Sequence, residues 1–426
     1  MIKATIVTYG CQMNEADSAR IKEILIAGGF TFVRDPDEAD VILLNTCSVR
    51  RRAEEKVFGK LAHLSPMKRQ RPGLVIGVVG CMGQSSADEI RSKAPFVDFV
   101  LPPHQHDKLA AILQERFADR LFAASGADLA PDSCPFVAHV AISRGCDNAC
   151  AYCVVPSVRG REVCHPRDQI EAEVGTLAAR GVLQIWLLGQ NVNSWRHQEH
   201  DFADLVRGLA GAFPALRFRF TSPHPRDFSE RLIATLAGCP NVARQVHLPL
   251  QSGSDRVLET MRRGYDLAHY LSRVELLRRY MPDVALSTDL ICGFPGETDD
   301  DFEKTLEAVR SIGFDTAYTF YYSPRPGTAA ANAPDQLPVA VRKDRLRRLI
   351  DLQLAVARER NQRLVGSVLE VLAERVAPRP PGHLLGRADS NRLVVFPGEP
   401  SLIGSYRRVT VVRADSVTVF GEPITD

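Results

Sequence analysis

The sequence has no long apolar run, and its opening residues lack the pattern of a secretory signal. None of its 426 residues lies in a stretch approaching the roughly 20 apolar residues that a membrane-spanning helix needs. The opening residues, MIKATIVTYGCQMN, have neither the charged start nor the apolar run nor the small-residue cleavage site of a secretory signal. We therefore expect a cytoplasmic protein without a membrane partner.

A strong net charge is also missing. The chain has 53 basic and 51 acidic residues, a formal charge of +2, so any surface that binds nucleic acid must be local. Cysteine, by contrast, is plentiful, with ten in the chain. In a reducing compartment these argue against a disulfide framework and favour metal binding or catalysis.

The length and the 45% apolar content predict two or three domains. Up to about residue 120, three short apolar runs are each followed by an amphipathic helical stretch, the pattern of a small open parallel α/β sheet. Residues 119–137 have little periodicity and several turn formers, which is typical of a linker. We place the first domain at residues 1–118.

From residue 132 to 362, apolar strands alternate with helices, which predicts a full or partial (β/α) barrel. This part ends in a long helix with eight basic and three acidic side chains between Arg342 and Arg363. Residues 364–426 then change to short alternating runs broken by Gly and Pro. That change predicts a small all-β barrel.

The clearest cysteine signal is the CxxxCxxC array in RGCDNACAYC, formed by Cys146, Cys150 and Cys153. Three thiolates in one loop suit a [4Fe–4S] cluster whose fourth iron stays open to another ligand. Structural zinc is the alternative, but it requires four ligands, and Cys164 or His165 would have to supply the missing one. Spacing alone leaves this alternative open.

A second set, Cys11, Cys47 and Cys81, follows three successive predicted strands of the first domain. Because the carboxyl ends of parallel strands line one edge of a sheet, we expect these thiols to converge and to hold a second cluster. The alternative is that each is a buried cysteine packed as a small apolar residue. The remaining cysteines show no such pattern and are expected to be structural or incidental: Cys134, Cys164, Cys239 and Cys292.

These motifs resemble the radical S-adenosylmethionine (SAM) methylthiotransferases over nearly the whole chain. The resemblance rests on TYGCQMNEADS, LLNTCSVRRRAEEKV, GCDNACAYCVVPSVRGRE, HLPLQSGSDRVLETMRRGY and DLICGFPGET. Within the family, GCQMNEAD, CSVRRRAE and GQNVN favour the MiaB-type branch, which makes 2-methylthio-N6-isopentenyladenosine (dimethylallyladenosine) in tRNA. Sister branches act on threonylcarbamoyladenosine or on a ribosomal-protein aspartate.

The resemblance implies a methylthiotransferase domain, a radical SAM core and a C-terminal TRAM domain that binds RNA. It implies that Cys146, Cys150 and Cys153 hold the cluster that binds SAM, and that the other three hold an auxiliary cluster that supplies sulfur. Two SAM molecules would then methylthiolate the adenosine at tRNA position 37, next to the anticodon. Flavodoxin or ferredoxin as electron donor and iron–sulfur carrier proteins are the further partners implied.

Barrel chemistry lies at the carboxyl ends of the strands, so Gln190, Asn191 and Gln251 are expected beside SAM. The alternative is that these amides only close βα loops. For RNA, the candidates are basic residues in four places: Arg50 to Arg52, Lys68 to Arg71, the helix from Arg342 to Arg363, and Arg407 with Arg408. A more distant alternative for the whole chain is a non-catalytic zinc and RNA binding protein.

Overall fold

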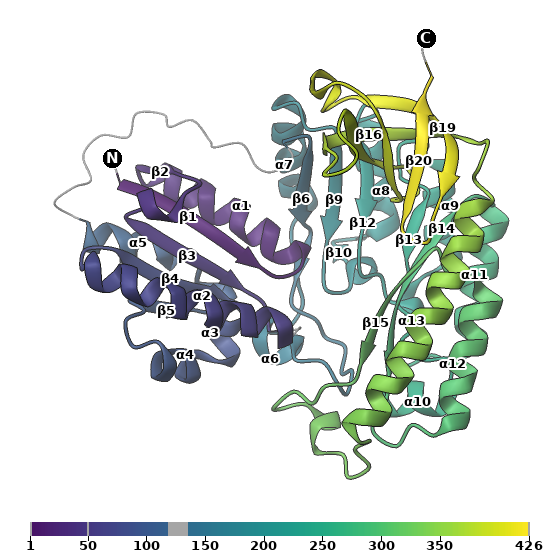
Figure 1. Cartoon of the computed structure of the whole chain (residues 1–426), viewed down its shortest axis with the longest axis horizontal. Coiled ribbons are helices and arrows are strands. Elements are labelled where there is room, and N and C mark those ends of the chain that lie inside the picture. Colours follow the sequence, from purple (N-terminus) through teal and green to yellow (C-terminus); the bar gives the residue numbers. More distant parts are fainter. Residues whose placement is uncertain (1, 49–50, 118–134, 425–426) are drawn as a thin grey trace. The chain divides into compact units, whose positions relative to one another are not determined.

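The computed structural model describes residues 2–48, 51–117 and 135–424, which form two compact units (Figure 1). The first unit consists of residues 1–133 with 144–148 and 153–163. The second consists of residues 134–143, 149–152 and 164–426. The predicted linker falls mostly outside the described residues.

The first unit is an open parallel sheet, as predicted. Its strands, in spatial order, are β2 (Phe30–Phe32), β1 (Ile2–Tyr9), β3 (Val41–Thr46), β4 (Val75–Gly80) and β5 (Phe99–Leu101). β3 and β4 are buried over their whole length, because helices cover both faces of the sheet. The short strands β2 and β5 were not predicted, since three residues are too few to show a period.

Neighbouring residues of β3 point into the two cores of this unit. Leu43 packs with Ile21 and Leu25 of helix α1 (Gln12–Ala27), and Leu44 packs with residues of α2 (Arg51–Gln70) on the other face. The core beside α1 also contains α5 (Lys108–Arg116), and the core beside α2 contains α4 (Ala87–Lys93). The predicted strand–helix units are therefore confirmed.

The second unit contains a partial barrel of six parallel strands. One sheet has β12 (Arg217–Phe220), β9 (Gln184–Leu188) and β6 (Val137–Ala141); the other has β13 (Gln245–His247), β14 (Ala285–Cys292) and β15 (Thr316–Tyr321). A parallel bridge between Phe218 and Val242 joins the two sheets. The covering helices include α7 (Arg167–Ala179), α8 (Phe202–Ala212), α9 (Glu230–Gly238), α11 (Leu267–Tyr280), α12 (Asp299–Ile312) and α13 (Val339–Gln362).

The C-terminal segment closes into the predicted small barrel. Its strands pair in the order β16 (Val368–Val376), β17 (His383–Ala388), β18 (Leu393–Pro397), β20 (Thr418–Pro423) and β19 (Tyr406–Ala414). Strand β17 was not predicted, because Gly386 interrupts its short apolar pattern. Among the helices that the structure describes, none combines the length and apolar character needed to cross a membrane.

Arg219 of β12 fastens this small barrel to the sheet of β12, β9 and β6. The side chain is 1% exposed and donates from Nε to Gln184 Oε1 at 2.8 Å. Its two terminal nitrogens donate to the carbonyl oxygens of Asp389 at 2.8 Å and Ala388 at 2.7 Å. A buried cation is tolerated here because its donors meet oriented acceptors.

We expect Arg219→Met to lower the free energy of unfolding by about 3 kcal/mol, since two buried carbonyls and an amide would lose their donor. The midpoint of urea unfolding measures this loss. Arg310→Met, at an exposed position of α12, is the matched control and should change stability by less than about 0.5 kcal/mol. Equal effects of the two substitutions would contradict this role of Arg219.

Candidate active site

Three cysteines of the first unit lie at one edge of its sheet. The register pairs Tyr9 with Thr46 and Thr46 with Gly80, so β1, β3 and β4 end at the same level. Each strand is followed within two residues by a cysteine: Cys11, Cys47 and Cys81. Cys47 and Cys81 are buried, whereas Cys11 is exposed. The structure therefore brings together the set that the sequence predicts at this edge.

The thiols of Cys11 and Cys47 are hydrogen-bonded to each other, and this bond is the main cause that lowers the pKa of Cys11 to about 6. The nearby guanidinium of Arg159 lowers it further. The pKa of Cys81 is raised, chiefly by burial, although Arg159 opposes this. One thiolate, a second thiol in contact with it and a cation close by are the conditions under which sulfur ligands bind iron.

A pair of buried amides holds the loops of Cys11 and Cys47 together. Asn14 Nδ2 donates to Asn45 Oδ1 at 3.1 Å, and Asn45 Nδ2 donates to the Asn14 carbonyl oxygen at 2.8 Å. Asn14 Oδ1 also accepts from the Cys11 backbone nitrogen at 3.2 Å. Gly80 adopts φ +90°, and a Cβ there would lie 2.5 Å from Asn45 Oδ1, so the residue before Cys81 must be glycine.

Arg159 is a site residue that the sequence analysis did not single out. Its side chain is 5% exposed, and its guanidinium forms a 2.7 Å ion pair with Asp17 and hydrogen-bonds Cys81. The arginine comes from helix α6 (Val155–Arg159), just after the CxxxCxxC array, and Asp17 lies in α1. Its only signal in the sequence is its place in PSVRGRE, next to the CxxxCxxC array.

The CxxxCxxC loop is closed by a short pairing of β7 (Ser143–Arg144) with β8 (Val163–Cys164). Gly145 opens it at φ +78°, where a Cβ would lie 2.0 Å from the Arg161 carbonyl oxygen. The backbone nitrogen of Cys146 donates to the Gly160 carbonyl at 3.2 Å, and Cys153 Sγ accepts from the Val155 nitrogen at 3.4 Å. The loop backbone is thus fixed by its own hydrogen bonds.

Cys150 has a cation as its partner. Arg263 donates from Nη1 to Cys150 Sγ at 3.1 Å, and its Nε donates to the hydroxyl of Tyr265 at 3.1 Å. The next residue of the loop, Ala151, is buried and bonds to the Met261 carbonyl. A guanidinium thus lies in hydrogen-bond contact with the sulfur of one of the three predicted iron ligands.

The amides predicted to contact SAM carry polar atoms that no described residue satisfies. Oε1 of Gln190, Oδ1 of Asn191 and Oε1 of Gln251 are buried without a hydrogen-bond partner among the described residues. Gln190 and Asn191 follow the carboxyl end of β9, and Gln251 follows that of β13 at φ +73°. Buried acceptors of this kind fit a ligand rich in N–H and O–H donors.

Within the part of the chain that the structure describes, no three Cys, His, Asp or Glu side chains close around one point as the ligands of an ion do. The thiols of a cubane cluster bind separate irons and stand farther apart than the ligands of a single ion.

Of the cysteines without a predicted role, Cys239 and Cys292 are buried, Cys164 lies in β8, and Cys134 lies outside the described residues.

Several basic residues predicted as RNA candidates are used inside the fold. Lys68 pairs with Asp98 at 2.8 Å, Arg71 donates to the Asp37 carbonyl, and Arg345 pairs with buried Glu297 at 2.6 Å. Such residues stabilise the fold and are poor phosphate ligands. Arg408 is exposed on β19, and Arg50 to Arg52 lie outside the described side chains.

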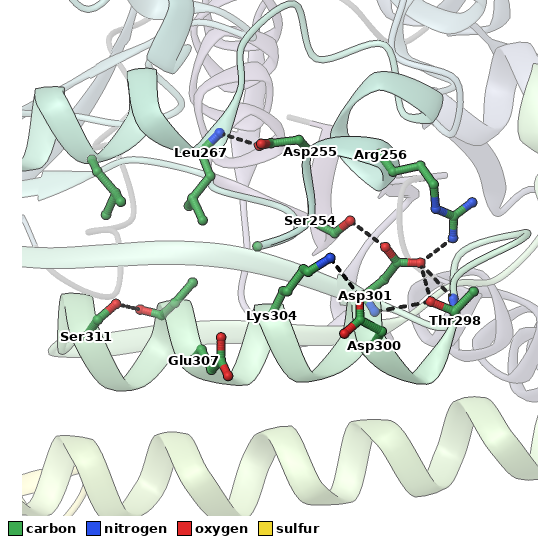
Figure 2. A pocket seen from close by; sticks show the side chains of 13 residues that line it. Ser254, Asp255, Arg256, Leu267, Thr298, Asp300, Asp301, Lys304, Glu307 and Ser311 are labelled. Carbon is green, nitrogen blue, oxygen red and sulfur yellow. Dashed lines mark hydrogen bonds and ion pairs between the residues drawn. The ribbon is translucent and has the colours of Figure 1, made fainter.

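A surface hollow of about 620 Å³ lies among α10 (Asp255–Thr260), α11 and α12 (Figure 2). Two ion pairs lie in it: Asp301 pairs with Arg256 and also accepts from Ser254 Oγ at 2.6 Å, and Lys304 pairs with Asp300. The lining residues include none of the predicted site residues. We assign no function to this hollow.

Comparison with protein-family models divides the chain into three matches. Residues 3–102 match Uncharacterized protein family UPF0004, residues 140–309 match the Radical SAM superfamily, and residues 362–424 match the TRAM domain. A radical SAM methyltransferase, TsrM from Kitasatospora setae, shares the fold, with a TM-score of 0.57 and 12% identity over 78% of this chain and 75% of that one. The chain is thus an enzyme of the radical SAM superfamily.

Curated relatives define the family more narrowly. The tRNA-2-methylthio-N(6)-dimethylallyladenosine synthase of Moorella thermoacetica is 43% identical over 100% of both chains. That of Chlorobaculum tepidum is 43% identical over 98% of this chain and 97% of the relative. The chain belongs to this family of radical SAM tRNA methylthiotransferases, which use SAM and [4Fe–4S] clusters, and the resemblance drawn from its motifs is confirmed.

In the iron-free chain, we expect iodoacetamide to alkylate Cys11 faster as the pH rises through about 6 and then to level off, because the lowered pKa makes its thiolate form there. Cys81, whose pKa is raised, should react more slowly over the same range. Mass spectrometry of the labelled peptides gives both rates. Cys47→Ala removes the hydrogen bond to Cys11 and should move the midpoint upward; an unchanged midpoint would refute the thiol contact.

Proposed function

We propose that Cys146, Cys150 and Cys153 hold a [4Fe–4S] cluster that binds SAM, and that Cys11, Cys47 and Cys81 hold a second cluster that supplies sulfur. The substrate is N6-isopentenyladenosine at position 37 of tRNA, and the product is its 2-methylthio derivative. The observation that carries this proposal is the convergence of three cysteines at one flush sheet edge, with two thiols in contact.

The reaction replaces a hydrogen on an aromatic ring carbon that ordinary acids and bases do not activate. When bound, the cluster and SAM supply a 5′-deoxyadenosyl radical and the second cluster supplies the methylthio group. The role of the protein is to orient these groups. The buried oxygens of Gln190, Asn191 and Gln251 fit the ammonium, hydroxyl and amine donors of SAM.

Each of the three parts of the chain has its own role in this proposal. Residues 1–118 form the methylthiotransferase domain, residues 132–362 the radical SAM core, and residues 364–426 the TRAM domain that binds tRNA. The enzyme works in the cytoplasm, where flavodoxin or ferredoxin supplies electrons and iron–sulfur carrier proteins load the clusters. The match of residues 362–424 to the TRAM model supports the RNA-binding role.

A sister methylthiotransferase differs from this proposal in its product alone. Mass spectrometry of tRNA nucleosides from cells with and without the gene separates the branches. The proposal requires 2-methylthio-N6-isopentenyladenosine to disappear and to return with the gene. Loss of a different methylthio product would assign the chain to a sister branch, and no change at all would reject the enzyme.

Two cysteine substitutions should have different effects. Cys150→Ala removes a ligand of the SAM cluster, so we expect reductive cleavage of SAM to fall below about 1% of the parent rate. Cys81→Ala should leave that cleavage within about threefold and abolish the methylthiolated product. Chromatography of 5′-deoxyadenosine and of nucleosides measures both.

Cys239→Ala, at a buried cysteine far along the chain from both sets, is the control and should keep both activities. Continued SAM cleavage by the Cys150→Ala chain would overturn the ligand assignment.

Binding of tRNA should depend on salt, because it releases counterions from phosphates. We expect affinity to fall at least about tenfold between 50 and 200 mM salt. Arg408→Ala, at an exposed position of the TRAM barrel, should weaken binding and flatten the slope, whereas Arg310→Ala of α12 should not. Fluorescence anisotropy of a labelled anticodon stem–loop measures this, and a flat salt response of the parent chain would refute a phosphate-contacting surface.

A further inference from the structure

Arg263 is buried beside Cys150 without a carboxylate partner. Its side chain lies in the loop between α10 and α11, and the residue is 5% exposed. The contacts of the guanidinium are Cys150 Sγ at 3.1 Å and the hydroxyl of Tyr265 at 3.1 Å. Among the residues that the structure describes, no Asp or Glu forms an ion pair with it.

Tyr265 fixes the position of this cation. Its hydroxyl accepts from Arg263 and donates to the carbonyl oxygens of Pro249 at 2.9 Å and Leu250 at 3.0 Å. These two residues directly precede Gln251. The guanidinium is therefore held in a defined place relative to the end of β13, and it does not sample alternatives as a surface arginine does.

The other charges around Arg263 are already balanced. Arg226 binds Asp227 through two nitrogens at 2.9 Å each, which neutralises both. His224 has its pKa lowered to about 3, first by burial and then by Arg263, so it is uncharged near neutral pH. The guanidinium of Arg263 remains as an uncompensated buried cation, and a buried cation requires an anion close by.

The cation next to Cys11, Cys47 and Cys81 is different. Arg159 is equally buried and hydrogen-bonds Cys81, but Asp17 neutralises it through a 2.7 Å ion pair. Each set of cysteines thus has one buried arginine in contact with a thiol, and only the arginine at Cys150 carries an unbalanced charge. Net charge and hydrogen bonds to sulfur are among the factors that set the potential of an iron–sulfur cluster.

We infer that Arg263 is a positioning residue that acts through Cys150 as the counter-cation of the cluster on Cys146, Cys150 and Cys153, and that it raises the reduction potential of that cluster. The inference rests on the proposed function. One-electron reduction adds a negative charge to the cluster, and a fixed guanidinium at a ligand sulfur stabilises that charge. In a redox titration of the cluster, dithionite supplies this electron.

The test uses the full-length chain with Cys11, Cys47 and Cys81 changed to Ala, so that one cluster gives the signal. Redox titration followed by electron paramagnetic resonance then compares Arg263→Met and Arg263→Lys with this parent. We expect Arg263→Met to lower the reduced-to-oxidised ratio at a given potential at least tenfold, a shift of about 59 mV for one electron. Arg263→Lys keeps the charge and should shift the potential less.

Arg262→Met is the matched control, because it removes the same charge from the adjacent, exposed residue and should leave the potential unchanged. An unchanged potential in Arg263→Met with full iron content would overturn the inference. If Arg263→Met loses iron, retention by Arg263→Lys supports a requirement for charge, whereas equal loss in both shows that shape alone matters and rejects it. A parent chain that binds no cluster would instead refute the proposed function.

Discussion

The parallel register of three strands is the constraint on which the site of Cys11, Cys47 and Cys81 depends. Tyr9, Thr46 and Gly80 lie side by side at the ends of β1, β3 and β4, and this alignment brings cysteines that are about 35 residues apart in the chain to one edge. A slip of one residue would move a thiol by about 3.3 Å and turn the strand's apolar side chains to the wrong face. Asn14 and Asn45 bond across this edge and oppose such a slip.

Buried arginines organise much of the remaining structure. Arg159 joins the segment after the CxxxCxxC array to α1, and Arg219 joins the small barrel to β12. Arg263 contacts Cys150 and, through Tyr265, is tied to the segment that follows β13. Each is stable inside because its donors meet a carboxylate, carbonyls or a sulfur. Since these contacts depend on where the acceptors lie, the replacement of any of them by lysine would not be conservative.

Ion pairs within the fold also reduce the number of basic side chains that are available to bind RNA. A cluster of basic letters in the sequence predicts a phosphate-binding face only if the side chains reach solvent. Lys68 and Arg345 pair with carboxylates inside the fold, and Arg360 pairs with Asp315 at 2.7 Å. The long helix α13 therefore uses part of its positive charge to hold the second unit together, and its exposed residues and those of the TRAM barrel remain as candidates.

The sequence by itself determined the main strands and helices and the fold class of each of the three parts, and it predicted two sets of cysteines as ligands, because apolar periodicity and residue spacing are local properties of a chain. The short strands β2 and β5 could not be predicted from the sequence, since three residues are too few to show a hydrophobic period. Only the tertiary structure decided that Cys11 touches Cys47, that Arg159 and Arg263 contact thiols, and that Lys68 pairs with Asp98. Those facts depend on strand register and on the pairing of distant charges, which no local pattern of residues encodes.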